Sequence, residues 1–184
     1  AVSNGASIIV MDDGHQNQIL KKSLSLLVVD AEVGFGNGKI FPAGPLRENL
    51  DEALNRSDAI ILMKPNKDYK PDDFLLDQLS KKVLINAYLK PTSILPKGKL
   101  YAFAGIGRPN KFFDSLRDSG GEIVEAISYS NHYKYKDIDI ENLFTLASEY
   151  KASLITTEKD YVRLPRGYRK GVHKWPVTVH FEDE

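Results

Sequence analysis

The chain has 184 residues, of which 42% are hydrophobic and 27% charged, a composition that suits one large or two small globular cores. Lysine plus arginine and aspartate plus glutamate both number 25, so the formal net charge is zero, which disfavours a nucleic-acid-binding protein. The sequence contains no cysteine, which excludes disulfides and thiolate metal sites. It begins with Ala1 rather than Met, and we expect the later part of a longer protein.

Apolar runs alternate with helical patterns in the first third of the chain. Strands are expected at 7–11, 24–30 and 58–63, and a short helix at 48–56. Continuous apolar strands separated by helices are typical of a parallel sheet covered on both faces. The polar stretch 64–70, which contains Pro65, is the best candidate for a boundary or hinge.

The same alternation continues to the end of the chain. Helices are expected at 71–80, 110–119 and 138–150, and strands at 83–89, 100–104, 122–127, 153–156 and 177–181. Pro71 suits the first turn of its helix. The basic, aromatic stretch 161–175 is either a solvated loop or a contact with anionic lipid.

Two adjacent carboxylates, Asp12 and Asp13, follow the first expected strand. Aspartates at strand ends commonly hold Mg²⁺ in phosphoryl-transfer enzymes, because Mg²⁺ prefers oxygen ligands. Asp-Asp-Gly is also typical of an ordinary turn. With Gln16 and a glycine-rich segment nearby we favour a functional site, and we assign no role to His15.

The glycine-rich segment 34–48 follows the second expected strand and ends in Arg47 and Glu48. Its glycines allow positive φ and close approach of a ligand, and their N–H groups could bind an anion. Arg47 offers bidentate contact to phosphate, and Glu48 could complete a set of metal ligands. The segment matches neither the Walker A nor the GxGxxG pattern, and an ordinary surface loop is the alternative.

Together these motifs resemble the tetraacyldisaccharide 4'-kinase family of the lipid A pathway. The family's Asp-Asp-Gly-Phe-Gln signature is matched at 12–16, with His15 in place of Phe. Its Gly-Phe-Gly-Asn-Gly…Pro-Ala-Gly-Pro-Leu-Arg-Glu signature stands intact at 34–48. Residues 103–113 and 156–160 resemble two later elements of the family, so the likeness covers nearly the whole chain.

The resemblance implies an α/β fold with a P-loop NTPase-like parallel sheet, helices on both of its faces, and a smaller C-terminal α/β subdomain. Residues 1–66 would be the remainder of the kinase core and 67–184 the C-terminal portion. The implied reaction is ATP- and Mg²⁺-dependent phosphorylation of the 4'-hydroxyl of a lipid disaccharide 1-phosphate. The implied location is the cytoplasmic face of the bacterial inner membrane, with the membrane surface as a partner.

Site roles follow from the same resemblance. Asp13 and His132 would be catalytic, and Asp12 and Glu48 would hold the metal. Gln16, Asn37 and Arg47 would bind substrate or nucleotide. His132 stands in Asn131-His132-Tyr133, where the family has an Asp-His-His type of segment.

One element of the family is missing: no Gly-x-x-x-x-Gly-Lys-Ser/Thr occurs in the 184 residues. In the family this P-loop and the acidic base precede the Asp-Asp strand. Because phosphoryl transfer depends on the P-loop, its lysine and Mg²⁺ together, we expect little or no kinase activity from this chain alone. The alternative is a non-catalytic nucleotide- or lipid-binding module derived from the same fold.

Overall fold

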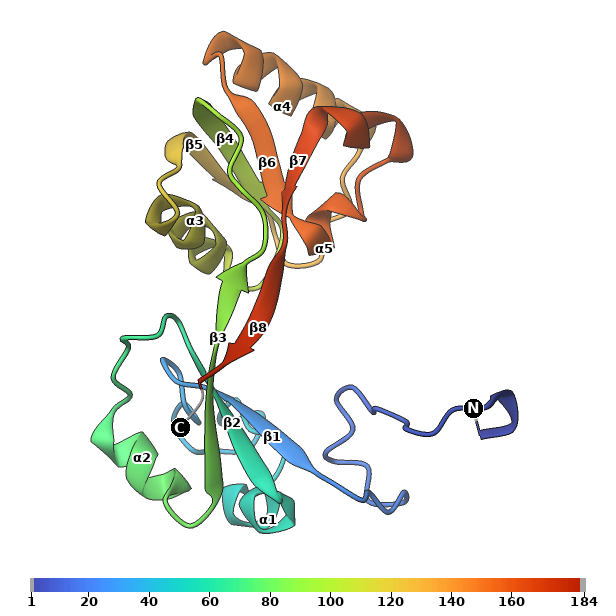
Figure 1. The fold of residues 1–184 in the computed structure, drawn as a ribbon, viewed down its shortest axis with the longest axis vertical. Helices are drawn as coiled ribbons and strands as arrows, with labels where there is room; N and C mark the ends of the chain where they lie inside the picture. Colours follow the sequence, from blue (N-terminus) through green and yellow to red (C-terminus); the bar gives the residue numbers. More distant parts are fainter. Residues whose placement is uncertain (1, 183–184) are drawn as a thin grey trace. The chain divides into compact units, whose positions relative to one another are not determined.

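A computed structural model describes residues 2–182, which form two compact units (Figure 1). The first unit runs to Leu89 and also takes in the chain from Val179 onward, and the second unit is Lys90–Thr178. The stretch 64–70, expected as a boundary, lies inside the first unit. It joins a strand to a helix there, and the strand after that helix continues the same sheet.

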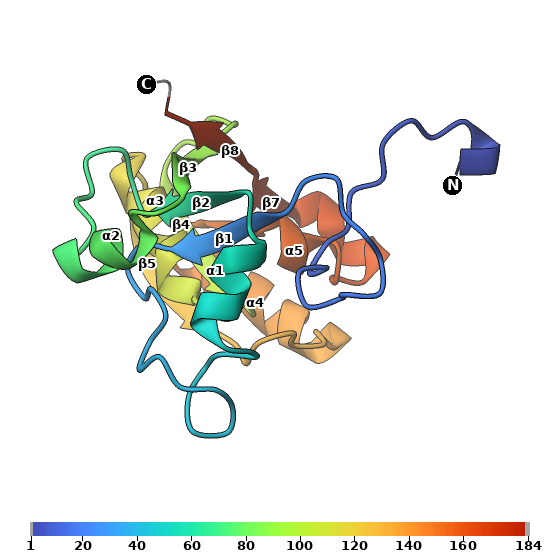
Figure 2. The same cartoon turned by 90° about the horizontal axis from the view of Figure 1, so that it is seen from below.

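The first unit contains one sheet with strand order β1-β2-β3-β8. Its strands are β1 (Leu26–Asp30), β2 (Ala59–Lys64), β3 (Val83–Pro91) and β8 (Val177–Phe181). β1, β2 and β3 are parallel neighbours. Helix α1 (Leu50–Arg56) connects β1 to β2, and α2 (Asp73–Leu79) connects β2 to β3 (Figure 2). A short 3₁₀ turn, η1 (Val2–Asn4), precedes them.

Only one face of this sheet is covered by helices of the described chain. Leu75 and Leu79 of α2 pack with Val29, Ile60 and Leu62 on that face, and Leu54 of α1 joins them. The other face leaves Val28 61% exposed. The strands follow one another in one direction, and right-handed crossovers then place both helices on the same side. The expectation of helices on both faces is therefore wrong for this sheet within residues 2–182.

The run 7–11 is not a strand, contrary to the sequence expectation. Ile8 is 79% exposed and Val10 is 88% exposed. A strand needs a hydrogen-bonded neighbour, and no strand of the described chain pairs with this run. The residues of this run favour a strand, but a strand also requires a neighbouring strand to pair with.

The second unit contains a parallel sheet with strand order β5-β4-β6-β7. Its strands are β4 (Lys99–Ala104), β5 (Glu122–Ser128), β6 (Ser153–Thr157) and β7 (Val172–Trp175). Its helices are α3 (Pro109–Asp118), α4 (Asp137–Glu149), the short α5 (Glu158–Tyr161) and the 3₁₀ turn η2 (Arg166–Gly171).

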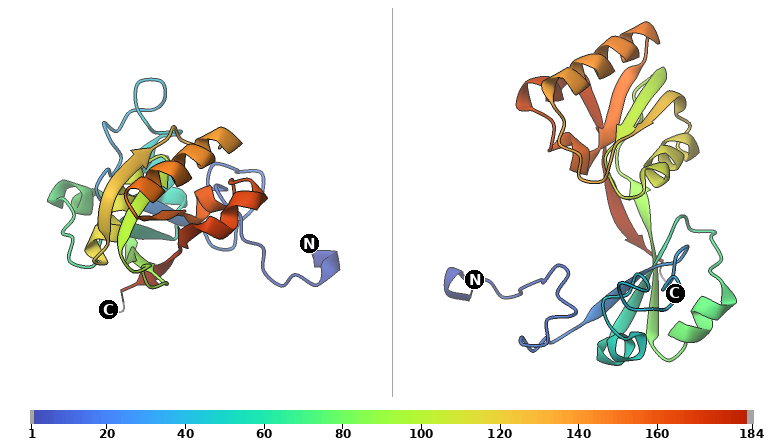
Figure 3. Two further views of the ribbon diagram at one scale, coloured as in Figure 1. Left: turned by 90° about the horizontal axis from the view of Figure 1, so that it is seen from above. Right: turned by 180° about the vertical axis from the view of Figure 1, so that it is seen from behind.

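Both faces of this second sheet are covered, as Figure 3 shows for α3 and α4. Alternate residues of β4 serve the two faces, because successive side chains of a strand point to opposite sides. Tyr101 and Phe103 pack with the α4 side, where Leu143 lies, while Ala102 packs with Leu116 on the α3 side. The chain goes from β4 to β5 in one direction and from β5 to β6 in the other, so α3 and α4 fall on opposite faces.

Most expected elements of the second unit are confirmed within one or two residues. The stretch 161–175 is the exception: it was expected to be a solvated loop or a contact with anionic lipid, and it contains η2 and β7 and the last residue of α5. In the first unit Pro71 is not in the first turn of its helix. Asp72 is the N-cap residue of α2, and its Oδ1 accepts a 2.7 Å bond from the Phe74 N–H.

Candidate functional site

The carboxylate pair lies in a turn rather than at a strand end. Asp12 and Asp13 are both exposed, and Asp13 adopts a positive φ of 51°. A second turn follows at once, closed by a 3.1 Å bond from the Asn17 N–H to the Gly14 carbonyl. The segment is therefore a compact double turn that presents polar side chains next to the glycine-rich segment.

The glycine-rich segment is a chain of turns between β1 and α1. The N–H of Gly34 donates to the Asp30 carbonyl at 2.8 Å, and two further turns place Gly36 and Gly38 at positive φ. Gly44 is required for a different reason, because a Cβ there would lie 2.3 Å from the Lys39 carbonyl oxygen. At that point the loop folds back on itself so tightly that only glycine fits.

Asn37 holds this loop together from inside. Its Nδ2 donates to the Ala43 carbonyl at 2.9 Å, while its Oδ1 accepts from the Lys39 N–H at 3.1 Å. Backbone bonds between Phe41 and Leu46 and between Leu46 and Lys39 close the same loop. The side chain predicted to touch nucleotide or substrate thus also shapes the loop.

An ion pair joins the two motifs. Arg47 Nη1 lies 2.7 Å from Asp13 Oδ2, across 34 residues of sequence. The hydrogen bond to Asp13 and the charge of its carboxylate raise the pKa of Arg47 above its ordinary value. Both side chains are exposed, so the pair adds little stability, but it brings together two groups that sequence reasoning placed in one cleft.

Glu48 is held by a second arginine. Its Oε2 is paired with an Nη2 atom of Arg56, the last residue of α1, and both side chains are largely buried. The other carboxylate oxygen, Oε1, is buried without a hydrogen-bond partner. A buried carboxylate oxygen normally has a partner, so this atom is suited to accept a cation or a donor from a ligand.

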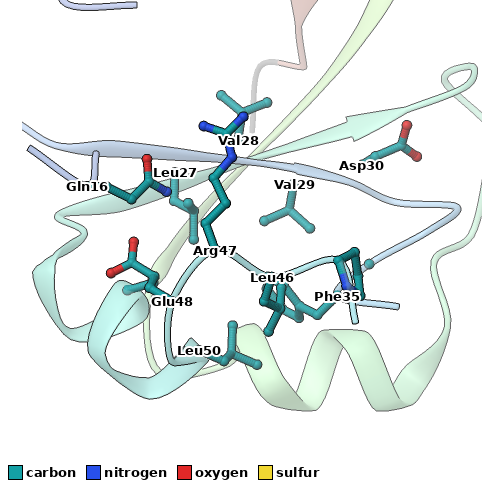
Figure 4. A pocket seen from close by; sticks show the side chains of 13 residues that line it. Gln16, Leu27, Val28, Val29, Asp30, Phe35, Leu46, Arg47, Glu48 and Leu50 are labelled. Atoms are coloured by element: carbon teal, nitrogen blue, oxygen red, sulfur yellow. The ribbon is translucent and has the colours of Figure 1, made fainter. Parts of the chain in front are cut away.

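A cavity of about 220 Å³ lies between the two motifs and the strand β1 (Figure 4). Its lining combines apolar residues of β1 and the glycine loop with polar side chains of both motifs. Figure 4 shows Gln16, Arg47 and Glu48 grouped on one side in this view, and Asp30 on the other. Three of the predicted site residues thus line one pocket of the first unit.

The donor set fits Mg²⁺ only as part of a larger coordination sphere. Among residues 2–182, no group of three or more His, Asp or Glu side chains could hold a metal ion unaided. Mg²⁺ usually takes one or two carboxylates, and water and substrate phosphates complete its sphere. The free Oε1 of Glu48 satisfies that requirement, whereas Asp12 lies in the exposed turn.

His15 has a structural position. Its Nδ1 lies 3.0 Å from the Ser25 hydroxyl, and its Nε2 lies 3.1 Å from the Ala53 carbonyl oxygen. It therefore ties the Asp-Asp-Gly turn to the start of β1 and to helix α1. A phenylalanine in this place could not make the two contacts of the ring nitrogens.

His132 lies in the second unit, on a turn after β5. Its backbone N–H donates to the Gly105 carbonyl at 2.9 Å, and its φ is 60°. Its Nδ1 lies 3.0 Å from Arg163 Nη2. Arg163 in turn contacts the fully buried Asp160.

Three charged residues around these sites were missed as functional candidates. Asp160 belongs to a family-like element, and Arg163 follows it by the three-residue spacing of neighbours on a helix, so that pair was open to detection. Arg56 comes eight residues after Glu48, which precedes helix α1. No regular spacing rule predicts a contact between these two positions.

The basic stretch 161–175 is largely used in folding. Trp175 is buried and donates through Nε1 to the Ser115 hydroxyl at 3.1 Å. Arg169 donates to the Val162 and Leu164 carbonyls, and Lys174 pairs with Glu158. Within the described part of the chain, no helix has the length and apolar character that crossing a membrane requires.

Comparison with known proteins identifies the wider group. The family model described as tetraacyldisaccharide-1-P 4'-kinase matches residues 1–184. A tetraacyldisaccharide 4'-kinase of Hyphomonas neptunium is 48% identical over 181 residues, 98% of this chain and 53% of that protein. One from Caulobacter sp. (strain K31) is 43% identical over 189 residues, 100% of this chain and 56% of that protein. The chain thus spans about half the length of these relatives.

A solved structure supports the fold. The chain is similar to LpxK of Aquifex aeolicus, crystallised in complex with ATP, with a TM-score of 0.62 and 23% identity. The likeness covers 92% of this chain and 51% of that one. It agrees with an α/β fold built on parallel sheets.

Proposed function

The chain belongs to the tetraacyldisaccharide 4'-kinase family, and we propose that it supplies one side of the catalytic cleft of a lipid kinase. The substrates would be ATP and a tetraacyldisaccharide 1-phosphate, and the acceptor its 4'-hydroxyl. The observation that carries the proposal is the Arg47–Asp13 ion pair, which joins the two motifs beside one cavity.

The reaction exchanges one P–O bond for another. The bond from the γ-phosphorus of ATP to its bridging oxygen breaks, a bond to the 4'-oxygen forms, and the hydroxyl proton passes to a base. Catalysis of such a transfer is mostly positioning and charge neutralisation. In this proposal Arg47 binds phosphate oxygens, Gln16 and Asn37 contact substrate or nucleotide, and Asp13 and His132 take part in catalysis.

Mg²⁺, when bound beside the phosphates, would neutralise charge on their oxygens. Glu48 would hold it through Oε1, and Asp12 is the second proposed ligand. Arg56 supports this assignment because it occupies only one oxygen of Glu48 and leaves the other unpartnered.

We extend the proposal to the finer architecture and the location. Residues 1–66 would be the remainder of a P-loop NTPase-like core and 67–184 the C-terminal portion of the kinase. The protein would work at the cytoplasmic face of the bacterial inner membrane, where its acylated substrate resides. Any basic contact with lipid would fall on exposed residues such as Arg166 rather than on the buried Trp175.

The test is ATP-dependent 4'-phosphorylation by a full-length kinase that contains this chain. Arg47→Ala should lower kcat/KM by roughly 10²-fold, because a phosphate contact made in the transition state is lost. Arg117→Ala is a matched control, since Arg117 forms a 2.8 Å pair with Asp114 that is also exposed, and it should keep normal activity. Wild-type rates in Arg47→Ala, Asp13→Ala and Glu48→Ala together would sink the site assignment.

A second measurement separates the kinase from the alternative binding module. The isolated 184-residue chain should show no turnover, since it lacks a Walker A sequence. If the full-length protein binds an ATP analogue and the lipid but never transfers phosphate, the non-catalytic module is the correct description.

A further inference from the structure

We infer that Arg163, held by the buried Asp160, positions His132 and fixes its imidazole in the tautomer that carries the proton on Nε2. The cluster lies at the carboxyl ends of β4 and β6. In this sheet the strand order reverses between those two strands, and open α/β sheets bind ligands at such a point. The inference deepens the proposed function and rests on it only for its consequence in catalysis.

The anchor of the cluster is Asp160, which is fully buried. Its Oδ2 accepts from the Gly105 N–H at 3.0 Å and from the Thr157 hydroxyl at 2.8 Å. Its Oδ1 lies 3.2 Å from Arg163 Nη1. Because a buried carboxylate needs such partners, Asp160 fixes both its own place and that of the guanidinium.

Arg163 uses both terminal nitrogens. Nη1 donates to Asp160 and also to the Gly105 carbonyl at 3.2 Å, while Nη2 points to His132 Nδ1 at 3.0 Å. A guanidinium has donors and no acceptor. His132 Nδ1 must therefore supply the lone pair, and in the neutral ring the proton then lies on Nε2.

The backbone of His132 is also fixed by contacts. Its N–H bonds to the same Gly105 carbonyl, and its left-handed φ of 60° is uncommon for a residue other than glycine. The rings of Tyr129 and Tyr133, with centroids 4.7 Å apart, flank the turn in sequence and pack on the core. Such a conformation persists only where the surroundings enforce it.

This arrangement leaves the Nε2–H of the exposed His132 as the ring group that can bind a ligand. In the proposed kinase it would donate a hydrogen bond to an anionic oxygen of a carboxylate or phosphate, rather than accept a proton there. Arg163 and Asp160 would act through His132 as positioning residues, without contact to the reacting atoms.

The tautomer can be measured on the 184-residue chain by ¹⁵N NMR of its imidazoles, with His132→Ala to assign the signal. We expect only the Nε2–H form in the wild type and in Arg163→Lys. In Arg163→Met we expect an admixture of the Nδ1–H form, as in a free neutral imidazole, which favours Nε2–H only in part. Arg169→Met is the matched control, because Arg169 binds two carbonyls of the same segment. His15, whose Nε2 faces a carbonyl oxygen, should be unchanged throughout. A wild-type His132 with its proton on Nδ1, or an unchanged ratio of the two tautomers in a folded Arg163→Met, would overturn the inference.

The consequence for catalysis is tested in the full-length kinase. Arg163→Met should lower kcat by roughly tenfold or more with little change in KM for ATP, and Arg163→Lys should recover part of the loss. In a His132→Ala background the same change should cost nothing further. Independent losses that multiply would show that Arg163 acts other than through His132. Wild-type turnover in His132→Ala would remove the proposed catalytic role of His132, while the NMR result would decide the positioning by itself.

Discussion

The two units use the same strand-helix-strand repeat, but the chain winds through them differently. In the first unit the order β1-β2-β3 advances in one direction, and both helices pack on one face. In the second the direction reverses after β5, and each face acquires its own core. The change in the direction of winding after β5, rather than amino-acid composition, decides which sheet has helices on both faces.

The two sites also use arginine in different ways. In the first unit Arg56 pairs with the carboxylate of Glu48, a proposed metal ligand, and leaves one of its oxygens unpartnered. In the second the carboxylate of Asp160 is buried and holds Arg163, which in turn holds an exposed imidazole. An arginine near a site can therefore support a ligand group directly or through one intermediate.

Loss of a core aromatic ring should cause the largest change in stability and so test the difference between the two sheets. Phe103→Ala should destabilise the second unit by about 3–5 kcal/mol, because the ring is fully buried and lies edge-on to Tyr135 at 5.6 Å. Val28→Ala, on the open face of the first sheet, should cost less than about 0.5 kcal/mol. Urea denaturation and hydrogen exchange of each unit measure the stability of the two variants. Equal losses of stability would contradict the difference between the covered faces of the second sheet and the open face of the first.

A smaller effect should come from the glycine loop. Gly44→Ala would place a Cβ 2.3 Å from the Lys39 carbonyl oxygen and 2.1 Å from Asn37 Oδ1, and we expect a cost of about 2–3 kcal/mol. Gly38→Ala is the control: it has open space but a φ of 68°, so about 1 kcal/mol is expected. Hydrogen exchange of residues 34–48 reports the loop itself. Equal protection in the two variants would show that the close fit at Gly44 is unimportant.

How much could be predicted depended on whether a residue's partners were close in sequence. The strands and helices of the second unit follow from apolar periodicity, since each one finds its neighbours within the unit. The run 7–11 has the same composition but no paired strand in the described chain, so local pattern misled there. β7 was missed because it has only two buried residues, Val172 and Trp175. The exposed His173 and Lys174 between them break the apolar run by which strands were recognised.

The site shows the same limit. The motifs around Asp13 and Arg47 predicted one cleft, and their ion pair agrees with it. The contacts of Glu48 with Arg56 and of His132 with Arg163 depend on how the loops fold back, which no spacing rule gives. Sequence reasoning therefore named Glu48 and His132 as candidates but did not predict Arg56 and Arg163, which contact them.

Alkaline pH should weaken the second unit by a moderate amount. Burial raises the pKa of Tyr129 to about 12, compared with 10.0 for an ordinary tyrosine. The unfolded chain therefore loses that proton first, so the stabilising contribution is complete below pH 10 and disappears as the pH rises toward 12. Tyr129→Phe should show a shallower loss of stability than the wild type between these values, measured by urea denaturation. Identical slopes would mean that the folded protein does not hold this hydroxyl protonated.

The smallest change in stability is expected in the exposed run 7–11 of the first unit. Ile8→Ser and Val10→Ser change apolar side chains that are 79% and 88% exposed, so they should alter the free energy of unfolding of this chain by less than about 0.5 kcal/mol. Ile60→Ser, a fully buried position on β2, is the contrasting control and should cost several times more. The pair of results matters because the three side chains are alike in type and differ in burial. A loss above about 1 kcal/mol in Val10→Ser would mean that 7–11 does pack on the first sheet, and the open face of that sheet would then need a new account.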